Sequence, residues 1–173
     1  MEVKTETRGH VLVITLDRPA ARNAINGAVA AGIEAAIDKL EGDDDLWVGI
    51  IQSSGTVFCA GADLKEVSAG NGRALSTERG GFAGLVKRER TKPLIAAVNG
   101  AAVAGGCEIV LSCDMVIAAD GPRLRPPAGN RPLAAADSGL ARRPRARVAS
   151  ISAQLSSVVR CTPRATCQNG RPA

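Results

Sequence analysis

The distribution of apolar and polar residues predicts alternating strands and helices in the first part of the chain. Residues 3–7 and 11–16 predict two strands joined by a turn at Arg8-Gly9-His10, and the second of them is an apolar run suited to a buried position. In residues 26–40 apolar side chains recur every three or four positions, as on the buried face of a helix. Residues 47–51 form another apolar run, and the order strand, helix, strand predicts a parallel, right-handed crossover.

The pattern weakens after the third predicted strand. Residues 67–81 are polar and Gly-rich, which predicts a mobile loop or a poorly ordered helix. Residues 82–90 predict a helix that ends before Pro93, since a proline forces the preceding residue towards an extended conformation. The cationic side chains here are interpreted as a solvated helix face rather than an anion site; they are Lys87, Arg88, Arg90 and Lys92.

Residues 93–119 predict a strand, a Gly-rich turn, a short helix and a second strand. The apolar run 93–98 ends at Asn99-Gly100, and only small side chains follow as far as Gly106. Amides at Gly105-Gly106 would open the helix, where the positive end of the helix dipole favours an anion. Glu108 lies one turn inside this helix.

Three motifs occur in this part of the chain. The N-terminal motif, residues 16–26, reads LDRPAARNAIN; the first signature, residues 56–66, reads TVFCAGADLKE; the second signature, residues 96–108, reads AAVNGAAVAGGCE. Together they resemble the crotonase (enoyl-CoA hydratase/isomerase) superfamily over residues 1–120.

The resemblance implies an α/β fold of the ClpP/crotonase type, a β-β-α superhelix, with residues 1–120 as its core. It implies a lyase of fatty-acid and acyl-CoA metabolism that adds water to 2-enoyl-CoA thioesters in a backbone oxyanion hole. An enoyl-CoA isomerase, a carnitinyl-CoA-type dehydratase and a non-catalytic remnant are the alternatives. No cofactor is implied beyond the coenzyme A of the substrate, and homotrimers or hexamers are typical of the family.

Site residues follow from the same resemblance. The amides of Ala62 and Gly105 would form the oxyanion hole, and Glu108 would be the general acid/base. Ordinary turn packing is the alternative for the two amides, and a carboxylate favoured by the helix dipole is the alternative for Glu108. The positions implied to contact the substrate and its coenzyme A are Ala21, Arg22, Ala60, Asp63, Leu64, Lys65 and Gly106.

Residues 121–173 differ in composition from the rest of the chain. They carry ten Arg and one acidic residue, whereas residues 1–120 carry 12 Lys and Arg against 16 Asp and Glu, so the net charge of +5 comes from the tail. Seven of the nine prolines also lie there. We expect a poorly ordered tail without the family's C-terminal helical layer. A nucleic-acid-binding arm is a weaker reading, because the tail has no aromatic residue and no recognised binding motif.

A frameshift is the interpretation that this composition favours. Residues 124–130 can be encoded by bases that, displaced by one position, read Phe-Gly-Leu-Pro-Pro-Glu-Ile, which resembles the family's Phe-Gly-x-Pro-Glu motif. That motif supplies a second catalytic glutamate about twenty residues after Glu108, where this sequence has Ala128. Without this second glutamate, hydration itself is in doubt.

Cysteine and histidine usage bears on metal binding, and hydropathy bears on the location of the protein. The five cysteines form no CxxC pair and His10 is the single histidine, so a metal site is not expected. The sequence has neither a signal peptide nor an uncharged apolar run of eighteen residues, which predicts a cytoplasmic protein with reduced thiols and no membrane partner.

Overall fold

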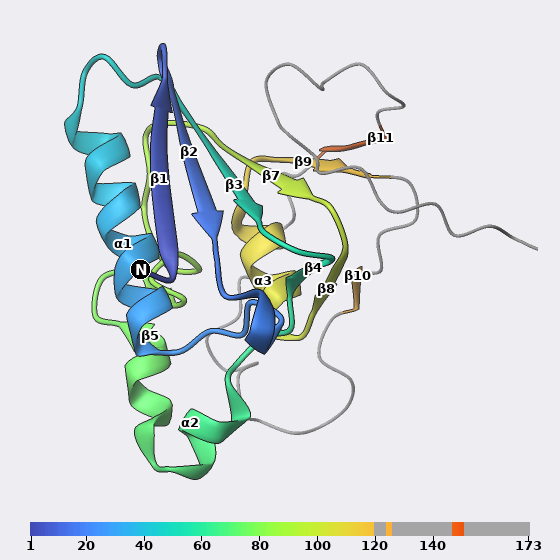
Figure 1. The fold of residues 1–173 in the computed structure, drawn as a ribbon. Coiled ribbons are helices and arrows are strands. Elements are labelled where there is room, and N and C mark those ends of the chain that lie inside the picture. Colours follow the sequence, from blue (N-terminus) through green and yellow to red (C-terminus); the bar gives the residue numbers. More distant parts are fainter. Residues whose placement is uncertain (120–123, 126–146, 151–173) are drawn as a thin grey trace, which may run out of the picture.

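A mixed sheet gathers strands from across the chain (Figure 1). The computed structural model describes residues 1–119, 124–125 and 147–150. In this part of the chain the main sheet has the order β1-β2-β3-β7-β9-β11, with β1 antiparallel to β2 and every other pair parallel. Its strands are β1 (Val3–Arg8), β2 (Val11–Leu16), β3 (Val48–Ser53), β7 (Leu94–Val98), β9 (Met115–Ala118) and β11 (Arg147–Ser150).

The first helix forms as its apolar period predicts. Helix α1 (Gly27–Gly42) begins after Asn26, whose side chain accepts a hydrogen bond from Val29 N at 2.8 Å. Its inward face, which includes Ile33 and Leu40, is fully buried against β1, β2 and β3. Because β2 and β3 are parallel, the parallel arrangement of the predicted crossover is confirmed.

A second, three-stranded sheet has the order β10-β8-β4, from β4 (Val57–Cys59), β8 (Ala101–Val103) and β10 (Leu124–Arg125). The Gly-rich turn expected after Val98 is therefore partly wrong, because β8 is a strand parallel to β4. Gly100 makes this pairing possible, since a Cβ there would collide with the carbonyl oxygen of Thr56. Helix α3 (Gly105–Ser112) then begins as predicted.

Residues 64–82 are more regular than expected. They form α2 (Leu64–Ser68), η2 (Asn71–Leu75), β5 (Ser76–Thr77) and β6 (Gly81–Phe82). One short helical turn, η1 (Pro19–Ala21), lies earlier in the chain, between β2 and α1.

The helix predicted over residues 82–90 is wrong. Ala83 and Gly84 both have left-handed backbones, with φ of 57° and 66°, and two such residues in succession end any right-handed helix. Gly84 is needed because its backbone lies directly against the carbonyl of Ala30 in α1. Close packing on α1 therefore replaces the helix with turns.

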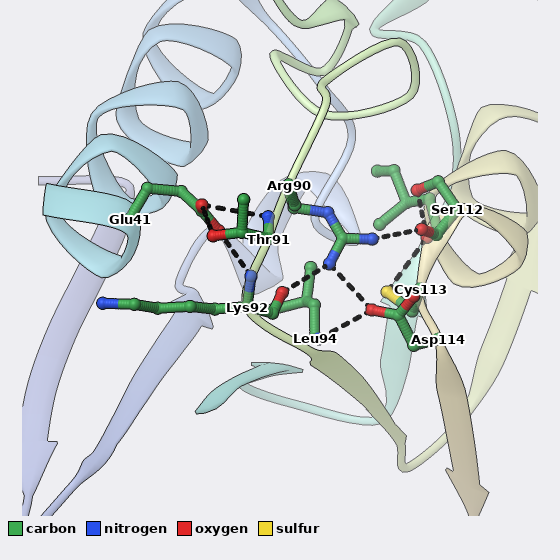
Figure 2. Close-up of polar contacts among 9 residues, drawn as sticks. Glu41, Arg90, Thr91, Lys92, Leu94, Ser112, Cys113 and Asp114 are labelled. Carbon is green, nitrogen blue, oxygen red and sulfur yellow. Dashed lines mark hydrogen bonds and ion pairs between the residues drawn. The ribbon is translucent and has the colours of Figure 1, made fainter. Parts of the chain in front are cut away.

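The basic residues after this turn do not form one solvated face, because Lys87 alone of the four is exposed, so that interpretation is wrong for Arg88, Arg90 and Lys92. The Arg90 guanidinium donates to Ser112 O at 2.7 Å and to Asp114 at 2.9 Å, and its side chain is 8% exposed (Figure 2). Arg88 pairs with Asp38 of α1. These partners are distant in sequence, which is why helical spacing alone misjudged them.

Thr91 and Lys92, which follow Arg90, are hydrogen-bonded to the C-terminal end of α1. Glu41 accepts hydrogen bonds from the backbone amides of Thr91 and Lys92, both at 3.0 Å (Figure 2). The Lys92 ammonium donates to the carbonyls of Leu40 and Asp43 and so satisfies the C-terminal end of the helix. Residues 88–92 thus hold the C-terminal ends of α1 and α3 in a fixed relation.

The tail is described only as the two short strands β10 and β11. They pair in parallel with β8 and β9 respectively. The remaining predictions for residues 121–173, namely low order, a missing helical layer and a shifted reading frame, lie outside the described residues.

We predict that Gly49→Ala destabilises the fold, because a Cβ at Gly49 would lie 2.7 Å from the Leu94 side chain and 2.8 Å from that of Leu40. Overpacking of this kind costs roughly 1–3 kcal/mol. Gly42→Ala is the control, since nothing lies within 4 Å of a Cβ at that position. Urea unfolding should show a lower free energy of unfolding for Gly49→Ala alone; equal stability of the two variants would contradict this packing.

Candidate active site

The first signature turns away from β4 at Gly61, whose φ of 91° is a left-handed conformation. Ile25 N donates to Gly61 O, and Asp63 N donates to Ile25 O, both at 2.8 Å, as a parallel bridge between Ile25 and Ala62. The peptide between Gly61 and Ala62 is trans, so its N–H points opposite to its carbonyl. The Ala62 amide is therefore directed away from Ile25.

The second signature packs directly against this turn. A Cβ at Gly61 would lie 3.1 Å from Gly105 N, and a Cβ at Gly106 would collide with the carbonyl oxygen of Cys59. The Gly105 amide begins α3 and so has no carbonyl one turn earlier within the helix to bond. Gly105 and Gly106 of the second signature thus lie against the backbone of the first.

The residue before α3 has an uncommon backbone. Ala104 has φ 48° and ψ −121°, a combination that glycine adopts far more readily than alanine. This conformation orients the start of the helix. Strained backbones of this type concentrate at functional sites.

Glu108 is in the first turn of α3 and is 2% exposed. Burial, followed by the charge of Glu108, raises the pKa of the neighbouring Cys107 thiol. The carboxylate therefore occupies a protein interior rather than a solvated helix end. A carboxylate held in a fixed place can act as a general acid/base where it lies within hydrogen-bond reach of the reacting proton.

Six of the seven residues expected to contact the substrate lie on two adjacent segments, and the seventh, Gly106, lies in α3. Ala60 N donates to Arg22 O at 3.1 Å, which places the Ala21–Arg22 turn beside the first signature. Leu64 and Lys65 begin α2 and are exposed, whereas the Asp63 side chain is buried.

The Asp63 carboxylate is bound within the protein. One oxygen accepts from Lys65 N at 3.0 Å and caps α2, and the other accepts from Arg18 at 2.6 Å. The Arg18 hydrogen bond is the main reason that the pKa of Asp63 lies below its usual range, with burial opposing it.

Sequence reasoning missed Asn23, which is 1% exposed and has a left-handed φ of 53°. Its side-chain amide donates to Ser54 O and Val57 O, both at 2.8 Å, and its oxygen accepts from Arg18 N. The sequence held one signal for this role, namely an asparagine in a run without regular pattern. Asparagine is enriched among the non-glycine residues that adopt a left-handed backbone.

Neither a metal-binding cluster nor a membrane-spanning helix occurs among the described residues, 1–119 with the two tail strands. No group of three or more His, Cys, Asp or Glu side chains is arranged there to hold a metal ion. None of the helices in this part of the chain is both long and apolar enough to cross a membrane.

The chain belongs to the enoyl-CoA hydratase/isomerase family. The family model matches residues 6–144, which contain all three motifs. The crotonase fold predicted from those motifs is confirmed, since solved enoyl-CoA hydratases superimpose on this chain.

Three relatives illustrate the similarity. The mevalonyl-coenzyme A hydratase of Aspergillus fumigatus is 42% identical over 135 residues, which are 77% of this chain and 50% of that protein. The crystal structure of an enoyl-CoA hydratase from Mycobacterium tuberculosis is 45% identical with a TM-score of 0.66, over 70% of this chain and 47% of that one. A carnitinyl-CoA hydratase structure from Mycobacterium avium is 44% identical with a TM-score of 0.67, over 70% and 47%.

The chain spans about half the length of the relatives it matches. The activity of whole family members is therefore a proposal for this chain. The roles assigned to Ala62, Gly105, Glu108 and the contact residues also stay predictions.

We predict that the Cys59 thiol makes stability fall at alkaline pH. Burial raises the pKa of Cys59 from 9.0 to about 12, so between these values the unfolded chain has lost a proton that the folded chain keeps. The contribution is complete below about pH 9 and is lost as the pH rises through about 12. Cys59→Ser should make the dependence shallower by about 1.4 kcal/mol per pH unit.

Urea unfolding from about pH 9.5 to about pH 11 measures this slope. Serine keeps an acceptor for the Gly61 amide, which donates to the Cys59 sulfur at 3.4 Å. Cys113→Ser is a parallel test, since burial raises the pKa of Cys113 to about 12 as well. A slope unchanged in Cys59→Ser would contradict the burial of this thiol.

Proposed function

We propose that this chain binds acyl-CoA thioesters and stabilises their enolates through the backbone amides of Ala62 and Gly105. The observation that carries the proposal is the packing of Gly61 against Gly105, which brings the two signatures together. The pairing of β4 with β8 holds them there.

The chemistry explains why two amides suit this substrate. Adding water at Cβ of an enoyl thioester, or removing a proton at Cα, places negative charge on the thioester oxygen. Preorganised amides in a site without water stabilise that charge, and loss of one such donor costs roughly 10²–10³ in rate. A Gly-rich turn suits this role because the substrate can approach its backbone closely.

Glu108 is the proposed general acid/base. Its burial at the start of α3 supports this role, because a carboxylate held in a fixed place can exchange a proton with Cα or with water. No cofactor is needed beyond the coenzyme A of the substrate, which the exposed Lys65 and the Ala21–Arg22 turn would contact.

Hydration is expected to be weak. It needs oxygen at Cβ and a proton at Cα, and the family pattern divides this work between two glutamates. Ala128 stands at the second position, outside the described residues. Shifting a double bond needs only one acid/base, so isomerase activity would be affected less. A dehydratase activity is a further catalytic alternative, and relatives include a carnitinyl-CoA dehydratase of Proteus mirabilis.

A trimeric or hexameric assembly and a cytoplasmic location remain predictions.

We predict that Glu108→Gln lowers the rate on a 3-enoyl-CoA by roughly 10²–10⁴, because the amide cannot exchange the proton. Purified full chain and variant are compared on crotonyl-CoA for hydration and on the 3-enoyl-CoA for isomerisation. Wild-type hydration should be slower than isomerisation.

Glu89→Gln is the matched control, because Glu89 is exposed and lies outside the two signatures. Its rates should remain those of the wild type. Hydration at a rate usual for the family, abolished by Glu108→Gln, would refute the expected impairment. No turnover of either substrate would favour a non-catalytic remnant.

A further inference from the structure

The N-terminal motif holds the first signature at several points along its backbone. The Asn23 side chain donates to Val57 O at 2.8 Å, and Ala60 N donates to Arg22 O at 3.1 Å. The bridge from Ile25 follows directly, with hydrogen bonds on both sides of Ala62. Consecutive contacts of this kind fix a turn that has little regular structure of its own.

Arg18 completes this set of contacts at the residue after Ala62. One guanidinium nitrogen donates to Asp63 at 2.6 Å and to Ala24 O at 3.1 Å, while Nε lies 3.0 Å from Glu2. The side chain is 22% exposed, and that of Asp63 is 9% exposed. A planar guanidinium can serve several acceptors at once in a fixed geometry, which a lysine ammonium cannot reproduce.

Asp63 therefore has no freedom to move independently of Arg18. Its amide bonds Ile25, one carboxylate oxygen caps α2, and the other bonds Arg18. The peptide that carries the Ala62 amide is one residue away. A displacement of about 1 Å at a catalytic group can cost as much as 10² in rate.

We propose that Arg18 is a positioning residue, which holds the Ala62 amide in place for the thioester oxygen through its ion pair with Asp63. This inference rests on the proposed function, because it assumes that the Ala62 amide receives that oxygen. The side chain of Arg18 contacts Glu2, Ala24 and Asp63, and its proposed effect passes through Asp63.

The readout must report on the amide rather than on stability. A conjugated dienoyl-CoA absorbs at longer wavelength when its carbonyl oxygen accepts strong hydrogen bonds. Its band on the purified full chain measures the polarisation directly. We expect Arg18→Met to lose at least about half of the wild-type shift and to lower kcat roughly 10–100-fold, with KM changed less than about threefold.

Asp63→Asn should have the same effect, since asparagine keeps the cap on α2 but loses the charge that Arg18 binds. The double variant should be no worse than the more affected single variant, because each single change already removes the same ion pair between Arg18 and Asp63. Arg79→Met is the matched control. Arg79 is 59% exposed and pairs with Asp38 of α1, so its removal should leave the shift unchanged.

The outcomes separate this inference from the function on which it rests. A full shift in folded Arg18→Met or folded Asp63→Asn would overturn the role of Arg18 while leaving the proposed function intact. No shift in the wild type would overturn both. Should Arg18→Met fail to fold in circular dichroism, Asp63→Asn carries the same decision.

Discussion

The backbone of residues 57–63 is held on both of its edges, and the candidate site depends on this double pairing. On one edge β4 runs parallel to β8, and on the other the N-terminal motif supplies side-chain and backbone hydrogen bonds. An amide donor has no side chain of its own to aim it. Its direction is set by the bonds that its neighbours make, and Gly61 and Asp63 make theirs with Ile25.

Close backbone packing requires small residues at these positions. Gly61, Gly100 and Gly106 each lie where a Cβ would meet neighbouring backbone at or below the closest normal contact. Ala104 accepts an unfavourable backbone so that α3 can begin against the first signature. The site is thus built from main chain, with Glu108 as the buried carboxylate beside it.

Local patterns predicted most of the fold. The apolar period of α1 and the runs in β2 and β3 are properties of short segments, and the motifs identified the family. The failures at Gly84 and Arg90 came from partners distant in the sequence. The turn at Gly84 packs against the carbonyl of Ala30, and Arg90 binds Asp114. Arg18 and Asn23 were missed for the same reason, since their spacing within the N-terminal motif says nothing of Asp63 or Val57.

The described residues contain the proposed charge-stabilising part of the site but not every group that distinguishes one reaction from another. Enolate formation is common to hydration, dehydration and double-bond migration, so two amides and one carboxylate would serve all three. The reactions diverge in the second acid/base, which hydration and dehydration need and migration does not. The tail supplies Ala128 where that group is expected. Under the proposed function, double-bond migration is therefore the reaction that Glu108 alone could complete, by removing a proton from one carbon of the enolate and returning it to another.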